Sequence, residues 1–156
     1  YDFVLGGIIM SEWTTVELNR INYLTNEIDA AYHEAARKLH LSDSALLILY
    51  TICNHGDGCL LYDICRLSGA SKQTINSSIR KLEKEGYLTL KPGKGRQMHI
   101  FLTKTGEALA QERIYPVIEI ENSVFDAMSE NECRELLKLS KKYMEIWKEN
   151  VKELLL

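Results

Sequence analysis

The apolar positions of this 156-residue chain predict a protein built mainly of helices. Between about residues 14 and 39, apolar side chains recur at steps of three and four residues, which is the period of an amphipathic helix. Ser42 then offers an N-cap for a second helix. The apolar body of that helix covers residues 45–52, and the glycine-containing turn of residues 55–58 ends it.

The next segment predicts two helices joined by a tight turn. A short helix covers about residues 60–67 and stops at Ser68 and Gly69. A longer helix begins at Ser71, a candidate N-cap, and ends at Gly86, where the backbone is free to adopt a positive φ. Two helices connected by so short a turn containing glycine are typical of a helix-turn-helix.

The hydrophobic period changes between residues 87 and 102. Apolar and polar residues alternate there on both sides of a Pro-Gly-Lys-Gly turn, which predicts a two-stranded hairpin and therefore a β-wing after the helix-turn-helix. After Thr103 the pattern is helical again, with a bend expected at Pro116 and a last helix beginning at the capping-box sequence of Ser129. The predicted fold class is mainly α with a small β-wing.

The distribution of charge changes what the net charge means. A total of −3 argues against nucleic acid as a partner when it is taken alone. Residues 66–104, however, hold nine basic and two acidic residues, a net charge of +7, which leaves −10 for the rest of the chain. A basic segment that coincides with a helix-turn-helix is typical of a duplex-binding surface. The alternative, lysines on an ordinary solvated helix, does not explain that coincidence.

The helix that begins at Ser71 divides into an apolar and a polar face. Ile75, Ile79 and Leu82 should pack inward, because they recur at steps of four and three residues. The polar face carries the DNA-binding candidates Ser71, Lys72, Gln73, Thr74, Asn76, Ser77, Arg80 and Lys81.

These candidates divide by the contacts that their side chains suit. Recognition helices present their N-terminal residues to the major groove, so we assign base contacts to Gln73, Asn76 and Ser77. At the wing tip, Lys94 and Arg96 are placed to reach a neighbouring groove or the backbone. Phosphate contacts are assigned to Lys72, Thr74 and Arg80.

The sequence predicts no enzyme, cofactor or metal site. It contains no GxSxG, P-loop, HExxH or glycine-rich strand-to-helix turn. The spacing of Cys53, His55, Cys59 and Cys65 matches no common zinc pattern, and Cys133 stands apart. We interpret the cysteines as packing residues of a protein in a reducing cytoplasm, with a metal or redox role as the alternative.

Neither a membrane span nor a secretion signal is predicted. No apolar stretch approaches the ~20 residues that cross a bilayer. Residues 1–10 are apolar but lack the basic n-region and the cleavage site of a signal peptide. These observations also lead us to expect a cytoplasmic protein.

Four segments of the chain resemble the MarR (multiple-antibiotic-resistance regulator) family, namely Ile64–Ile75, Leu82–Leu88, Leu102–Gly106 and Met128–Glu132. The resemblance implies a dimeric winged helix-turn-helix transcription regulator, often a repressor that is relieved by a small anionic or phenolic ligand. It further implies that residues 11–40 and 104–156 form a helical dimerisation region, and that residues 41–103 form the DNA-binding region of one intertwined domain. A winged helix that mediates protein contacts without specific DNA binding is the alternative function.

The resemblance also directs attention to the terminal helices. Their apolar stripes are wide for one small core, which supports a dimer, although they could instead close a monomer core. Tyr32, His33 and Arg37 on the first helix are candidates for an effector cleft, with an ordinary surface histidine as the alternative. The dimer candidates are Ile21, Leu24, Tyr143, Trp147 and Val151.

Two residues depart from the family pattern. Lys94 stands where the family wing usually has an Asp two residues before the groove-inserting Arg, which here is Arg96. The carboxylate that would orient that Arg is therefore missing, and Lys94 offers an additional phosphate contact instead. Cys65 stands where the family commonly has Ala, which favours a packing role for it.

Overall fold

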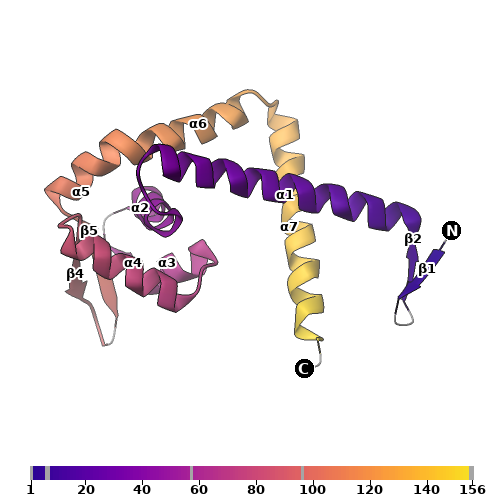
Figure 1. The fold of residues 1–156 in the computed structure, drawn as a ribbon, viewed down its shortest axis with the longest axis horizontal. Helices are drawn as coiled ribbons and strands as arrows, with labels where there is room; N and C mark the ends of the chain where they lie inside the picture. Colours follow the sequence, from indigo (N-terminus) through magenta and orange to yellow (C-terminus); the bar gives the residue numbers. More distant parts are fainter. Residues whose placement is uncertain (1, 6–7, 57, 96, 155–156) are drawn as a thin grey trace. The chain divides into compact units, whose positions relative to one another are not determined.

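The computed structural model describes residues 2–5, 8–56, 58–95 and 97–154, which are mainly helical with two small antiparallel sheets (Figure 1). This architecture confirms the predicted fold class. The chain divides into two compact units, Tyr1–Ile114 and Tyr115–Leu156. The predicted pairing of residues 11–40 with residues 104–156 around a separate 41–103 region stays a prediction.

The first unit opens with a strand pair and a long helix. Strands β1 (Asp2–Leu5) and β2 (Ile8–Ser11) are antiparallel and lead into α1 (Glu12–Lys38), a helix of 27 residues. Helix α1 confirms the amphipathic segment predicted near residues 14–39. The strand pair was not predicted, because its apolar residues follow one another without the alternation that marks a half-buried strand.

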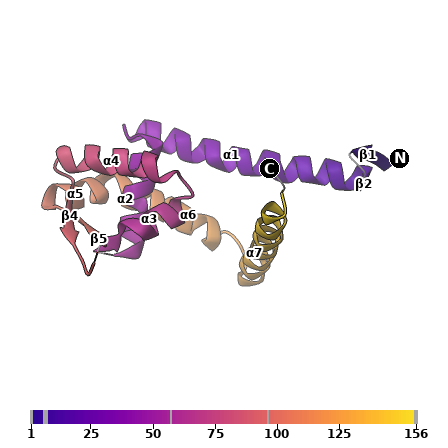
Figure 2. The same ribbon diagram turned by 90° about the horizontal axis from the view of Figure 1, so that it is seen from below.

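Three helices follow, α2 (Asp43–His55), α3 (Leu61–Ser68) and α4 (Lys72–Lys84), and their ends agree with the predicted signals. The backbone N–H of Ala45 donates to Ser42 Oγ at 3.2 Å, which caps α2. Between α3 and α4, Gly69 adopts a φ of +64°, a left-handed conformation that suits glycine. Helix α2 packs against both α3 and α4 (Figure 2).

The wing belongs to a three-stranded sheet with the order β3-β5-β4. Strands β4 (Leu88–Pro92) and β5 (Met98–Leu102) form the predicted antiparallel hairpin, and β3 (Cys59–Leu60) pairs with the other edge of β5. Strand β3 was not predicted, since two residues are too few to show a period.

The core joins α2, α3 and α4 to the sheet. Its fully buried side chains come mainly from helices, and each contributes about 1.5–3 kcal/mol relative to an exposed position. Thr51 is the one buried polar residue among those described, and its hydroxyl donates to the Leu47 carbonyl at 2.7 Å. The largest buried side chains are Ile48, Leu49, Ile52, Ile64, Ile75, Ile79, Ile100 and Ile114.

The chain after Thr103 is helical, as predicted. It forms α5 (Lys104–Leu109), a π-helical turn η1 (Ala110–Ile114), α6 (Tyr115–Asp126) and α7 (Glu130–Lys152). The π-helical turn stands immediately before Tyr115 and Pro116, and such turns accompany irregularities in helices. The bend expected at Pro116 itself stays a prediction.

Helix α7 begins with the predicted capping box. Ser129 Oγ accepts from the backbone N–H of Glu132 at 3.3 Å, and the Ser129 backbone N–H donates to Glu132 Oε2 at 2.8 Å. Hydrogen bonds from the Ser129 hydroxyl and backbone N–H hold the pKa of the Glu132 carboxyl below its usual value. No described residue of α7 is buried.

The four cysteines are free thiols. Cys59 is buried, whereas Cys53, Cys65 and Cys133 are half-buried. Burial raises the pKa of the Cys53 thiol, and burial together with the Asp63 carboxylate raises that of Cys59. In the described part of the chain, no group of three or more His, Cys, Asp or Glu could hold a metal ion, and no helix is long and apolar enough to cross a membrane.

Candidate nucleic-acid interface

Helix α4 has the two faces that its sequence predicts. Ile75 is fully buried, and Ile79 and Leu82 are each 2% exposed. Of the candidates on the polar face, Asn76 alone is half-buried. The structure thus brings the candidates together on one surface, and those that are exposed are Ser71, Lys72, Gln73, Thr74, Ser77, Arg80 and Lys81.

The first turn of α4 holds two hydroxyl groups in place. Ser71 Oγ accepts from the Thr74 backbone N–H at 3.1 Å and lies 2.8 Å from Thr74 Oγ1. The predicted N-cap is therefore confirmed, and both hydroxyls are engaged with each other. The positive end of the helix dipole at this turn favours a negatively charged group, such as a phosphate, over an uncharged one.

The two acidic residues of the basic segment lie beside basic residues of α4. Arg80 donates to Glu83 Oε2 at 3.0 Å, and Lys81 Nζ lies 4.0 Å from Glu85 Oε1. Both cationic side chains are more than 70% exposed. Solvent-exposed pairs of this kind contribute at most about 1 kcal/mol, so a phosphate can replace the carboxylate at little cost.

A hydrogen bond joins α4 to α2, the helix against which it packs. The hydroxyls of Ser44 in α2 and Ser78 in α4 lie 2.6 Å apart, 34 residues apart in sequence. Sequence reasoning did not identify this pair, because neither serine stands out in a local pattern. The contact attaches the polar recognition surface to the core helix beneath it.

The wing is anchored by a side chain that was also missed. His99 Nδ1 donates to the Gly58 carbonyl at 2.8 Å, which ties β5 to the segment before β3. Lys91 Nζ lies 4.6 Å from the centroid of the Phe101 ring, a cation–π contact on the same hairpin. Lys94 is exposed at the turn of the wing, and Arg96 lies outside the described residues.

The five dimer candidates are exposed within the single chain. Ile21 and Leu24 are 46% and 56% exposed on α1, and Trp147 is 60% exposed on α7. Tyr143 and Val151 on the same helix are 48% and 43% exposed. Large apolar side chains so open to water are typical of surfaces that a partner covers.

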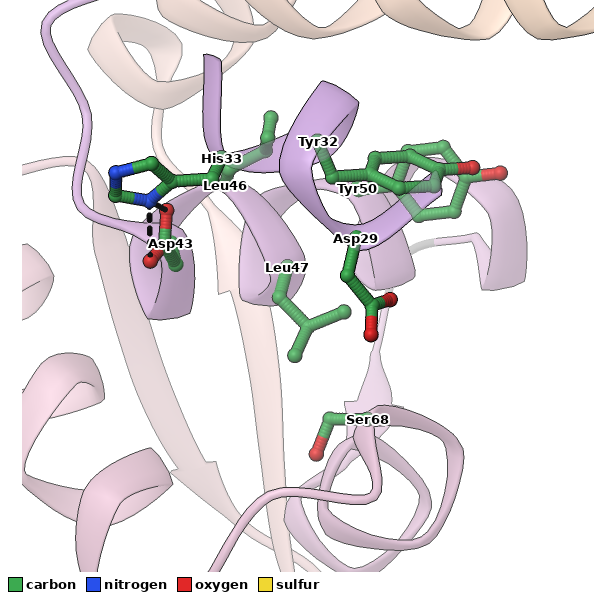
Figure 3. A pocket seen from close by; sticks show the side chains of 8 residues that line it. All are labelled: Asp29, Tyr32, His33, Asp43, Leu46, Leu47, Tyr50 and Ser68. Atoms are coloured by element: carbon green, nitrogen blue, oxygen red, sulfur yellow. Dashed lines mark hydrogen bonds and ion pairs between the residues drawn. The ribbon is translucent and has the colours of Figure 1, made fainter. Parts of the chain in front are cut away.

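A cleft of about 470 Å³ lies within the first unit, between α1, α2 and the last residue of α3 (Figure 3). Tyr32 and His33, two of the three effector-cleft candidates, line it. Arg37 is exposed and does not line the cleft. Asp29, which sequence reasoning missed, lines it together with Asp43. The spacing of Asp29 from Tyr32 and His33 places these residues on one helix face and was the available signal.

Comparison with known proteins bears directly on this arrangement. Residues 40–97, which hold the helix-turn-helix and most of the wing, match the model of the MarR family. The winged helix-turn-helix of this chain is similar to that of the MarR family. The predicted resemblance is therefore confirmed over the part of the chain that carries the polar face of α4.

Solved structures extend the likeness beyond that segment. NMB1585, a MarR family regulator from Neisseria meningitidis, superposes with a TM-score of 0.78 at 20% identity, over 88% of this chain and 97% of the other. S. aureus MepR in its DNA-binding conformation gives 0.72 at 20% identity, over 81% and 98%.

A third structure concerns the regulation of DNA binding in Bordetella bronchiseptica BpsR by 6-hydroxynicotinic acid. It gives a TM-score of 0.61 at 18% identity, over 80% of this chain and 98% of the other. At these identities the likenesses show a shared MarR fold. No curated protein matches the sequence.

Proposed function

We propose that this protein is a sequence-specific duplex-DNA-binding transcription regulator that acts as a homodimeric repressor. The MarR fold supports the class of function, and the exposed candidates of α4 supply the contacts. A DNA regulator needs no catalytic residues, and none is assigned. The proposed site of action is the cytoplasm, in a cell that keeps its chromosome in that compartment.

One observation carries the proposal: the basic segment and the recognition surface coincide. Residues 66–104 carry a net charge of +7, and the two carboxylates among them lie beside the exposed side chains of Arg80 and Lys81. The remaining −10 should repel DNA and orient the docked face. A winged helix that only mediates protein contacts would not require this separation of charge.

Salt dependence of DNA binding tests the proposal. Neutralising about 6–10 phosphates per dimer should lower the affinity for duplex DNA by roughly 10³–10⁵ between about 50 and 200 mM salt. Fluorescence anisotropy with a labelled duplex measures this slope.

A matched pair of variants makes the test specific. Lys72→Ala should reduce the salt slope, because Lys72 is exposed at the start of α4. Lys142→Ala, which removes an exposed cation from α7, should leave the slope unchanged. Binding that is absent or insensitive to salt would favour the protein-contact module instead.

A small-molecule effector completes the proposed mechanism. The cleft between α1, α2 and the end of α3 supports it, because a ligand there would contact the helix that precedes the recognition helix. The BpsR structure offers a precedent within the fold, since its DNA binding is regulated by a small molecule. The effector would act by lowering affinity for the operator.

A further inference from the structure

The walls of the cleft carry negative charge. Asp29 from α1 and Asp43 from α2 both line it. No lysine or arginine is among the described residues of the lining, and His33 is its one group that can become cationic. A ligand carboxylate or phenolate would therefore meet two carboxylates and no permanent cation.

The two carboxylates differ in their surroundings. His33 Nδ1 donates to both carboxylate oxygens of Asp43 at 2.9 Å, so Asp43 already has a partner. Asp29 makes no hydrogen bond or ion pair with any described residue. Its carboxylate points toward the Ser68 end of the cleft and away from the His33–Asp43 pair (Figure 3). Asp29 is thus the acceptor available to a ligand.

The rest of the lining suits an aromatic body. Leu46 is 5% exposed, and Leu47 and Tyr50 are half-buried beside it. Tyr32 adds a second phenol ring from α1 (Figure 3). The faces of aromatic rings attract cations, whereas aliphatic side chains exclude water from a flat ligand.

We propose that this cleft binds an aromatic ligand with one cationic amine or amidine group, held by Asp29, while its ring packs against Leu47 and the two tyrosines. The regulatory consequence of this inference rests on the proposed function. The charge of the proposed ligand is the reverse of that of the anionic effector which the family resemblance implies. The cleft volume of about 470 Å³ accommodates a two-ring compound.

The position of Ser68 couples the cleft to DNA binding. Ser68 is the last residue of α3, and Gly69 with its φ of +64° and the N-cap Ser71 follow directly. A ligand that contacts Ser68 therefore acts on the turn that sets the direction of α4. Occupancy of the cleft should lower DNA affinity by favouring a different orientation of this turn.

Three probes that share one ring system and differ in charge test the ligand class. Naphthylmethylamine is cationic, naphthylmethanol is neutral and naphthoate is anionic. Calorimetric titration of the full chain should show the amine binding about tenfold more tightly than either other probe. The variant Asp29→Asn should abolish that preference. Glu27→Gln removes an exposed carboxylate of the same helix outside the cleft and should retain it.

Several outcomes would overturn the proposal. These are naphthoate binding as tightly as the amine, a preference that survives Asp29→Asn, or no binding by any probe at about 1 mM. Amine binding that depends on Asp29 but leaves DNA affinity unchanged would confirm the site and overturn the coupling. If the protein shows no salt-dependent DNA binding, the proposed function as a regulator is refuted. The charge preference among the three probes would still decide which class of ligand the cleft binds.

Discussion

At the scale of single residues, Gly106 shows how closely the wing approaches α5. A Cβ placed on Gly106 would lie 2.0 Å from the Tyr87 carbonyl oxygen. That oxygen is held in place, because it accepts from the Thr103 backbone N–H at 3.0 Å. Only glycine fits this contact between α5 and the residue before β4.

The variant Gly106→Ala should therefore destabilise the fold. The clash involves backbone on both sides, and we expect the free energy of unfolding to fall by about 3 kcal/mol. Urea unfolding followed by circular dichroism measures the change. Glu107→Ala, at the exposed neighbouring position, should stay within about 0.5 kcal/mol of the unmodified protein. Equal stability of the two variants would contradict the packing argument.

The residues that were predicted correctly share a local signal. The caps Ser42, Ser71 and Ser129 were found because a capping side chain bonds to backbone only a few residues away. The pairs Ser44–Ser78 and His99–Gly58 were missed, because they join positions that are 34 and 41 residues apart. Periodicity within one element carries no information about such contacts.

At the scale of elements, the proposed recognition helix α4 offers side chains suited to two kinds of DNA contact. Asn76 is half-buried near the middle of the polar face, whereas Lys81 is 71% exposed near the end of α4. An amide offers a bidentate pattern to adenine, whereas a flexible ammonium serves a phosphate.

Asn76→Ala should lower specific affinity by about 1–3 kcal/mol and relax the preference at one base pair. Lys81→Ala should weaken cognate and random duplexes alike, since its contact is to the backbone. Anisotropy titrations on an operator and a scrambled duplex separate the two effects. Equal loss on both duplexes for Asn76→Ala would refute the assignment of a base contact.

The elements also show where prediction from sequence ended. The helices, the wing and the inward residues of α4 follow from periods of 3.6 and 2 that any one segment displays. The cleft does not, because it exists only where α1, α2 and the end of α3 meet. Arg37 was placed in it by its closeness in sequence to His33, yet it lies one helical turn further along α1, beyond the residues that line the cleft.

At the scale of the whole molecule, the separation of charge and the exposed apolar helices point to one assembly. A chain that concentrates +7 in residues 66–104 gains affinity when two copies present that surface to one duplex. Helix α7, with no described residue buried, offers a continuous apolar stripe for a second copy. Two-fold symmetry would then place the half-sites about one helical turn apart.

Trp147→Glu tests this assembly, because Trp147 is 60% exposed in the single chain and aromatic residues dominate interface energetics. We expect the dimer dissociation constant to rise about 30-fold or more, equivalent to about 2 kcal/mol. Sedimentation equilibrium measures it. Asn150→Glu adds the same charge to the same helix and should leave the dimer intact. On a duplex with two half-sites, Trp147→Glu should lose the advantage over a single half-site. An unmodified protein that sediments as a monomer at micromolar concentration would instead support helices that close a monomer core.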